Sequence, residues 1–134
     1  MFPSKNDRER ILIVDDDESI RSGLKESLES KGFKIYLASD GLEAGVLAAK
    51  REPALIILDI KMQGLDGFNA CRLIRSNPLL KNIKILALTG HPSKVNVTRI
   101  LRFGADRCLA KPVSGKNLLR AIDRLLDLRK EQNA

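Results

Sequence analysis

Residues 54–59 of the chain read ALIILD, five apolar residues followed by an aspartate. An uninterrupted apolar run of this length, preceded by Pro53, is typical of a β-strand that is buried on both faces of a parallel sheet. Similar runs occur at residues 11–14 (ILIV) and at residues 83–88, where only Lys84 interrupts the apolar residues. We therefore predict that these three segments form the centre of one sheet.

Helical patterns alternate with strand patterns along the chain, five times in all. Phe33, Ile35 and Leu37 alternate with polar residues, which predicts a more exposed edge strand, and a short last strand is expected at residues 107–110. The expected helices have apolar faces at Ile20, Leu24 and Leu28; at Leu42, Val46 and Leu47; at Phe68, Cys71 and Ile74; within residues 93–103; and at Leu118, Ile122, Leu125 and Leu126. Such alternation predicts an α/β fold around a five-stranded parallel sheet.

Capping residues and helix breakers predict where these helices begin and end. Asp40 is suited to cap the second helix, and Asn77-Pro78 ends the third helix. Gly32 and Gly104 stand where the first and fourth helices need a left-handed residue after their last turn. The last helix is expected to end near Arg129.

Length and composition indicate one domain. The 134 residues, 43% hydrophobic and 31% charged, are ordinary for a globular protein and exclude an intrinsically disordered chain. No apolar run approaches the roughly 20 residues of a membrane span. The two cysteines, Cys71 and Cys108, have apolar neighbours, and we expect buried free thiols in a cytoplasmic protein. The domain is predicted at residues 11–129, after a polar N-terminal extension (residues 1–10) and before a polar stub (residues 130–134), either alone or as a piece of a larger protein.

Positive charge is concentrated in the middle of the chain. The net charge is +7, and residues 61–111 contain ten lysines and arginines but only two acids, Asp66 and Asp106. Such a region can attract an acidic partner, although a solvated surface without a partner is the simpler interpretation. With four Phe, one Tyr and no Trp, the sequence lacks the interleaved aromatic and basic residues of many nucleic-acid-binding proteins. Direct binding to nucleic acid is therefore not expected.

Polar residues follow four of the predicted strands at their carboxyl ends, where ligands bind in open parallel sheets. They are Asp15-Asp16-Asp17, Asp59, Thr89-Gly90 and Lys111-Pro112. Carboxylates brought close together repel unless a cation lies among them, and oxygen ligands favour Mg²⁺, with Mn²⁺ as an alternative. A single histidine excludes a zinc site built from His and Cys. A divalent cation, a lysine and a hydroxyl around a carboxylate predict phosphoryl transfer to Asp59.

Four segments at these strand ends, ILIVDDDESIR, LIILDIKMQGLDGF, LALTG and GADRCLAKPV, resemble those of one known family. The spacing is 43 residues from Asp16 to Asp59, 30 from there to Thr89 and 22 more to Lys111. On these motifs, residues 11–128 are similar to a response-regulator receiver domain of the CheY-like family of two-component signalling. The resemblance implies a flavodoxin-like, doubly wound (βα)5 fold with strand order 2-1-3-4-5.

The resemblance also implies an acceptor and a metal site. Asp59 would accept a phosphoryl group from a sensor histidine kinase or a phosphotransfer protein. The domain would then be a signalling acceptor and not an enzyme that acts on other substrates. Asp16 would bind Mg²⁺ directly and Asp15 through water, and the backbone carbonyl of Lys61 would complete the ligands that the protein supplies.

Thr89 and Lys111 would contact the bound phosphoryl group, and Lys111-Pro112 is expected to be a cis peptide. In many receivers, an aromatic residue at the position of Cys108 moves inward together with the threonine. Cysteine is too small for this movement, so we expect Cys108 to pack in the core while Thr89 carries the switch. Binding of a phosphoryl mimic should show whether Thr89 moves without Cys108.

Two further features are implied for the surface. Lys61 and His91 would flank the acceptor and tune the lifetime of the phosphoryl group. Lys61 would slow its loss, unless this lysine is simply solvated. His91 is more readily interpreted as a loop histidine than as a general base.

The output surface of the family combines the fourth helix, fifth strand and fifth helix. Arg99, Arg102 and Arg107 would make it basic, which favours an acidic protein partner or a homodimer through the same surface.

Two other functions are compatible with the sequence. A haloacid-dehalogenase-type phosphatase would use Asp15 as nucleophile and Asp17 as acid–base. That family needs a further acidic pair at a late strand end, but the acids after Lys111 are on or beyond a helix. A binding module that works without phosphorylation is the second alternative, although such a module would not need the acidic, hydroxyl and lysine residues described above.

Overall fold

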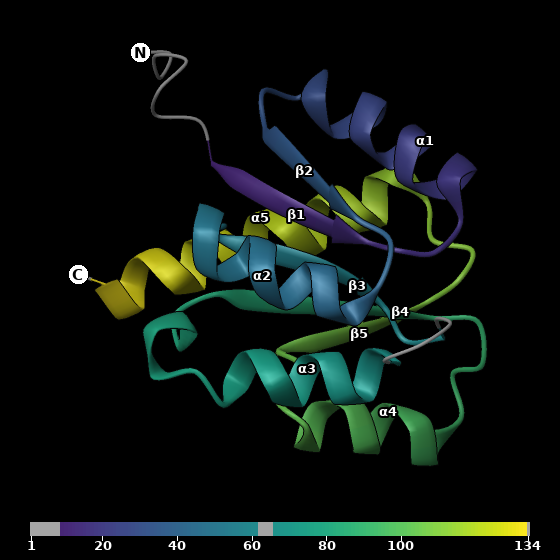
Figure 1. Cartoon of the computed structure of the whole chain (residues 1–134). Helices are drawn as coiled ribbons and strands as arrows, with labels where there is room; N and C mark the ends of the chain where they lie inside the picture. Colours follow the sequence, from purple (N-terminus) through teal and green to yellow (C-terminus); the bar gives the residue numbers. More distant parts are fainter. Residues whose placement is uncertain (1–8, 62–65, 134) are drawn as a thin grey trace.

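The computed structural model describes residues 9–61 and 66–133; residues 1–8, 62–65 and 134 lie outside the described part. Five parallel strands form a sheet in the order β2-β1-β3-β4-β5 (Figure 1). The strands are β1 (Arg10–Val14), β2 (Lys34–Ala38), β3 (Leu55–Asp59), β4 (Lys84–Thr89) and β5 (Arg107–Ala110). The predicted fold class and strand order are confirmed, whereas the extension expected at residues 1–10 lies mostly outside the described residues.

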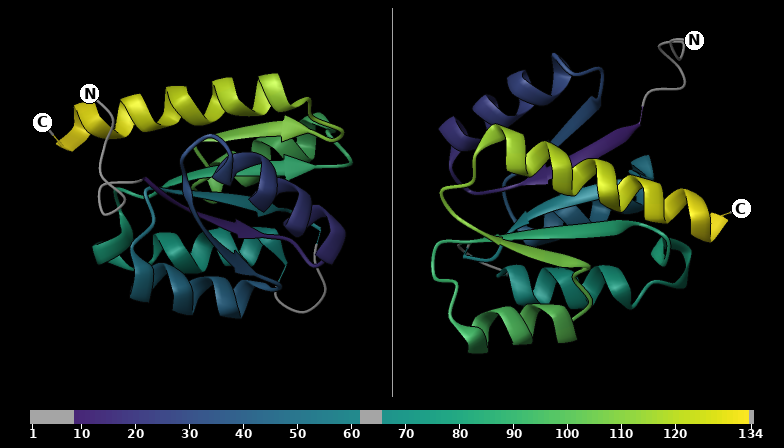
Figure 2. Two further views of the ribbon diagram at one scale, coloured as in Figure 1. Left: turned by 90° about the horizontal axis from the view of Figure 1, so that it is seen from above. Right: turned by 180° about the vertical axis from the view of Figure 1, so that it is seen from behind.

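Within the described residues, five α-helices and a short 3₁₀-helix connect the strands. They are α1 (Glu18–Glu29), α2 (Gly41–Arg51), α3 (Gly67–Arg75), the 3₁₀-helix η2 (Pro78–Leu80), α4 (Lys94–Arg102) and α5 (Gly115–Asn133). Helices α1 and α5 cover one face of the sheet, and α2, α3 and α4 cover the other (Figure 2). The direction of winding reverses between β1 and β3, which places the ligand-binding edge of such a sheet at the carboxyl ends of these two strands.

The core has one layer on each face of the sheet, because successive strand residues point to opposite faces. Ile11 and Ile13 of β1 pack beneath α1 and α5, whereas Leu12 and Val14 pack beneath α2, α3 and α4. All residues of β3 and β4 are buried, while β2 at the edge is only partly buried. The prediction of central strands buried on both faces, with a more exposed second strand, is confirmed.

Helix α2 turns a different side toward the sheet than the predicted one. Leu42 and Val46 are each 65% exposed, whereas Ala44 and Ala48 are fully buried and Leu47 is partly buried. The small alanine side chains let the helix lie close to the sheet. The predicted apolar face was therefore wrong at Leu42 and Val46, since a pattern of large apolar residues gives little weight to alanine.

Most of the predicted helix ends are confirmed. Asp40 caps α2 with its side chain, and Gly32 and Gly104 have left-handed φ angles of +94° and +115°. The Lys111-Pro112 peptide is cis, as expected. Helix α5, however, continues to Asn133, beyond the end predicted at Arg129, because the residues that follow contain neither glycine nor proline.

Candidate functional site

The carboxyl ends of β1, β3, β4 and β5 lie at one edge of the sheet (Figure 1), and each of them carries a polar side chain. Asp15 follows β1, Asp59 ends β3, Thr89 ends β4 and Lys111 follows β5. Asp15, Asp59 and Thr89 are only 2%, 6% and 4% exposed. Burying polar groups this deeply costs free energy unless other polar groups satisfy them. The burial of three polar side chains therefore marks this edge of the sheet as the candidate site.

Three carboxylates at this edge are close enough to share one cation. Asp15, Asp16 and Asp59 each offer an oxygen, and these oxygens lie within 4.8 Å of one another. Asp15 and Asp59 are buried and Asp16 is exposed, so the cluster is open to solvent on one side. Carboxylate oxygens with access to water fit the coordination that Mg²⁺ requires. The structure thus brings together the three acids that the sequence places after the first and third strands.

Lys111 joins the two buried carboxylates. Its Nζ lies 3.1 Å from Oδ1 of Asp59 and 3.3 Å from Oδ2 of Asp15. Burial, together with the neighbouring charge of Asp15, raises the pKa of Asp59, and Lys111 only partly opposes this rise. Partial burial by itself would lower the pKa of Lys111, but the hydrogen bond and charge of Asp59 and the charge of Asp15 outweigh burial and raise it. One ammonium group shared between these two buried carboxylates leaves a formal excess of negative charge, which favours a cation.

Hydrogen bonds in the turn after β1 give Asp15 and Asp17 different tasks. Oδ1 of Asp15 accepts the N–H of Asp17 at 2.9 Å, and the guanidinium of Arg21 donates to the backbone carbonyl of Asp15 at 2.6 Å. Oδ1 of Asp17 caps α1 by accepting the N–H of Ile20 at 3.1 Å. Asp17 therefore stabilises the helix, which does not favour its use as the acid–base of a phosphatase. Arg21 was not predicted, since its one signal is an arginine in the first turn of a helix that follows three aspartates.

A hollow of about 250 Å³ beside Thr89 is lined by Ile60, Lys61, Asp66, Phe68, Thr89, His91, Asn96 and Arg99. Oγ1 of Thr89 accepts the backbone N–H of His91 at 3.0 Å, and the backbone N–H of Lys61 donates to Oδ1 of Asp59 at 3.4 Å. The side chains of Lys61 and His91 are exposed. Both residues therefore share one hollow with Thr89, and the tuning roles assigned to them stay predictions.

The two cysteines differ in burial. Cys71 on α3 is fully buried, its thiol donates to the backbone carbonyl of Phe103 at 3.3 Å, and burial raises its pKa to about 11. Cys108 in β5 is only partly buried against the core beneath α2, α3 and α4, and burial raises its pKa as well. Cys108 packs against the core as expected, but it is only partly buried, because β5 is an edge strand with one open side.

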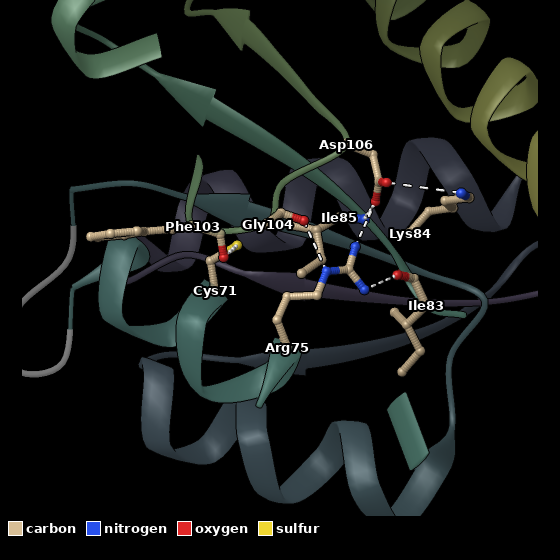
Figure 3. A network of polar contacts seen from close by, with 8 residues as sticks. All are labelled: Cys71, Arg75, Ile83, Lys84, Ile85, Phe103, Gly104 and Asp106. Atoms are coloured by element: carbon tan, nitrogen blue, oxygen red, sulfur yellow. Dashed lines mark hydrogen bonds and ion pairs between the residues drawn. The ribbon is translucent and has the colours of Figure 1, made fainter. Parts of the chain in front are cut away.

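A second polar cluster, which the sequence did not reveal, lies at the opposite end of β4 (Figure 3). The guanidinium of Arg75 on α3 donates to the carbonyls of Gly104 at 2.8 Å and Ile83 at 2.6 Å, and to Oδ2 of Asp106 at 2.7 Å. The same oxygen of Asp106 accepts the N–H of Ile85 at 2.8 Å. Arg75 therefore ties α3 to the start of β4 and to the loop before β5.

Comparison with known proteins decides the family. The family model of the response regulator receiver domain matches residues 11–123. The chain belongs to this family. The match supports a receiver domain of two-component signalling over the phosphatase and over a binding module unrelated to phosphorylation.

Individual relatives agree with this assignment. The response regulator MprA of Mycobacterium leprae (strain TN) is 39% identical over 125 residues, which are 93% of this receiver domain chain and 54% of the relative. The chain spans about half the length of the curated relatives that it matches.

Two solved structures resemble the receiver domain closely. A CheY-like receiver domain protein of Methanospirillum hungatei JF-1 has a TM-score of 0.88 and 30% identity, covering 93% of this chain and 98% of the other. The receiver domain of a signal transduction histidine kinase of Syntrophus aciditrophicus has a TM-score of 0.82 and 34% identity, covering 89% and 90%. Among the described helices of this receiver domain, none has the length and apolar character needed to cross a membrane.

Proposed function

We propose that Asp59 accepts a phosphoryl group from the phosphohistidine of a sensor kinase or a phosphotransfer protein, with Mg²⁺ bound beside it. One observation carries this proposal: the buried Asp59 carboxylate contacts the Lys111 ammonium at 3.1 Å and belongs to the cluster of three carboxylates. Asp59 thus contacts a protein cation and belongs to a candidate metal site. Phosphoryl transfer depends mainly on such positioning and neutralisation of charge.

The hydrogen bonds favour Asp59 over Asp15 as the acceptor. Both oxygens of Asp15 are engaged, one by the N–H of Asp17 and the other by Lys111. On Asp59, Lys111 and the N–H of Lys61 both contact Oδ1. Within the described part of the chain, Oδ2 of Asp59 has no hydrogen-bond donor, so this oxygen has lone pairs to attack phosphorus.

In the transfer, an oxygen of Asp59 forms a bond to phosphorus while the P–N bond of the phosphohistidine breaks, and the histidine nitrogen keeps the electron pair. Lys111 neutralises part of the charge on the transferred group. The hydroxyl of Thr89 accepts the N–H of His91, which leaves its own proton to donate to a phosphoryl oxygen. The product is an acyl phosphate, and hydrolysis of its P–O bond restores the carboxylate.

Asp15, Asp16, Asp59 and the backbone carbonyl of Lys61 would hold Mg²⁺ or, in its place, Mn²⁺. The donor set fits because it combines two buried carboxylates with an exposed one, all within 4.8 Å. When bound, the cation supplies charge neutralisation at the phosphoryl oxygens. Direct binding by Asp16 and water-mediated binding by Asp15 are part of the proposal.

Phosphorylation would be signalled through Thr89 to the surface of α4, β5 and α5. Cys108 on β5 has no ring that could swing inward, so the change must pass through Thr89 and the loop that follows it. Lys61, exposed beside the acceptor, would slow loss of the phosphoryl group, whereas His91 would be a loop residue. The output partner would be an acidic protein or a second copy of the domain.

Labelling with acetyl phosphate, a small phosphoryl donor, tests this function. In the presence of Mg²⁺ the unaltered protein should gain the mass of one phosphoryl group, and EDTA should abolish the gain. Asp59→Asn should not be labelled, whereas Asp123→Asn, which removes an exposed carboxylate of α5, should be labelled normally. Normal labelling of Asp59→Asn, with loss of labelling in Asp15→Asn, would reject the proposal in favour of the phosphatase.

A further inference from the structure

A hollow of about 550 Å³ runs along α4 and is lined by Lys94, Val95, Thr98, Arg99, Arg102 and Phe103. The first five residues recur at the spacing of one helix face, and Phe103 closes the C-terminal end of that face. This hollow is separate from the one beside Thr89, although Arg99 contributes to both. We call it the α4 hollow.

The two helices beside the α4 hollow carry positive charge only. Helices α3 and α4 contain no aspartate or glutamate. Among the side chains that the structure describes, Arg72, Lys94, Arg99 and Arg102 form no ion pair with a carboxylate. All four are exposed. A surface with a single sign of charge over two neighbouring helices attracts an acidic partner and accelerates its association.

Two phenylalanine rings hold the guanidinium groups in place without neutralising them. The guanidinium carbon of Arg99 lies 4.1 Å from the ring centroid of Phe68 and 5.4 Å from that of Phe103. The guanidinium of Arg72 on α3 lies 6.0 Å from the centroid of Phe103. Stacking covers one face of a guanidinium group and leaves its N–H edge available to a carboxylate. Arg72 and Arg99 are therefore already oriented to bind carboxylates.

We propose that the α4 hollow, with Arg72 at its edge, binds an acidic amphipathic segment of a protein partner. Carboxylates would pair with the arginines, while an apolar side chain would pack on Val95, which is 74% exposed, and on the ring of Phe103. A protein partner is favoured over nucleic acid because the two rings at the hollow are covered and offer little surface for base stacking: Phe68 is buried and Phe103 is half-buried against the arginines.

This surface shares Arg99 and Arg102 with the predicted output surface of α4, β5 and α5, and it extends toward α3 through Arg72 and the ring of Phe68. Its charge is present in the unphosphorylated protein. Binding at the α4 hollow therefore does not depend on phosphoryl transfer to Asp59, and the two proposals can fail separately.

The probe is a fluorescein-labelled helical peptide with glutamates on one face and leucine and phenylalanine on the other, titrated with the 134-residue chain and followed by anisotropy. The test variant is Arg99→Gln/Arg102→Gln. The matched control, Lys31→Gln/Lys34→Gln, removes two exposed lysines after α1 and at the start of β2, outside the predicted output surface, and has the same net charge. We expect the test variant to weaken binding at least about tenfold and the control to change it less than about twofold.

Thermal melts by circular dichroism establish that both variants are folded. Equal weakening in the two variants would overturn the proposal, because the attraction would then follow net charge alone. Val95→Ser tests the apolar contact without changing charge: it should weaken binding of the probe but not of a peptide in which serines replace leucine and phenylalanine. A single-stranded oligonucleotide of equal charge that displaces the probe more efficiently than unlabelled peptide would also overturn the proposal, since it would identify a nucleic-acid site.

Discussion

The ionised carboxylate of Asp59 is costly in the ligand-free protein, because it is 6% exposed and lies beside the charge of Asp15. Lys111 offsets part of this cost with one ammonium group shared between the two acids. The remaining negative charge is what gives the edge of the sheet its attraction for a cation. On the proposed function, this arrangement would serve a bound cation at the expense of stability without one.

Asp59→Asn should raise the free energy of unfolding at neutral pH in EDTA, because it removes a charge that the fold disfavours. The folded-state pKa of Asp59 lies above its ordinary value of 3.8, so the folded protein binds the proton more readily than the unfolded chain as the pH falls. Protonation then removes the unfavourable charge of Asp59 from the unaltered protein as well. The difference in free energy of unfolding between the variant and the unaltered protein should therefore shrink as the pH falls toward about 4. Urea unfolding across this range measures the difference. A variant less stable than the unaltered protein at neutral pH would contradict the electrostatic argument.

The two thiols should differ in reactivity. Cys71 is fully buried and has a pKa of about 11, so it should not react with Ellman's reagent until the protein unfolds. Cys108 is partly exposed and should react slowly in the folded protein. Cys108→Ser should abolish the reaction of the folded protein, and Cys71→Ser should preserve it. Rapid modification of both thiols without denaturant would show that α3 is not packed as described.

Gly67, at the start of α3, has no space for a side chain. A Cβ atom there would lie 2.5 Å from Cα of Ile60 and 2.6 Å from the carbonyl oxygen of Asp59. Gly67→Ala should therefore lower the free energy of unfolding by about 1–3 kcal/mol. Gly23→Ala is the control: nothing lies within 4 Å of its added atom in α1, and it should gain about 0.5–1 kcal/mol from helix propensity. Urea unfolding compares the variants, and equal stability of the two would contradict this packing.

Helices and strands could be predicted from the sequence where the local spacing of apolar residues also determines which side of the element is buried. The apolar spacing of Phe68, Cys71 and Ile74 predicts the buried face of α3, and all three are buried. The side of α2 that meets the sheet was not predictable, because Ala44 and Ala48 carry little apolar signal and matter only through close approach to the sheet. The sequence also contains no sign of long-range pairing such as that of Arg75 and Asp106, 31 residues apart.

Replacing Arg75 tests the attachment of α3. Lysine has one ammonium group and cannot reproduce the fork that bonds Gly104, Ile83 and Asp106. Arg75→Lys should lower the free energy of unfolding by about 2–4 kcal/mol, since at least two hydrogen bonds from a charged group are lost. Arg72→Lys, on the exposed side of the same helix, should change it by less than about 0.5 kcal/mol. Urea denaturation of the two variants measures this difference. Equal midpoints would show that the hydrogen bonds of Arg75 do not hold α3 in place.

The topology of the entire sheet explains why residues far apart in the sequence form one site. Placing β1 and β3 side by side in the middle brings Asp15 and Asp59 to the same edge, with Lys111 arriving from β5. The alternation of strands and helices predicts the parallel sheet. It does not order the strands, because central strands that are apolar on both faces are equivalent in pattern. The order 2-1-3-4-5 was implied by the resemblance to the receiver family.

The most direct test is to locate the phosphoryl group by borohydride trapping. Protein treated with acetyl phosphate and Mg²⁺ is reduced with sodium borohydride, which converts an aspartyl phosphate to homoserine, and the modified residue is found by peptide mass spectrometry. We predict conversion at position 59 alone, and none when EDTA replaces Mg²⁺. Conversion at position 15, with an unmodified aspartate at position 59, would contradict the assignment of Asp59 as the acceptor.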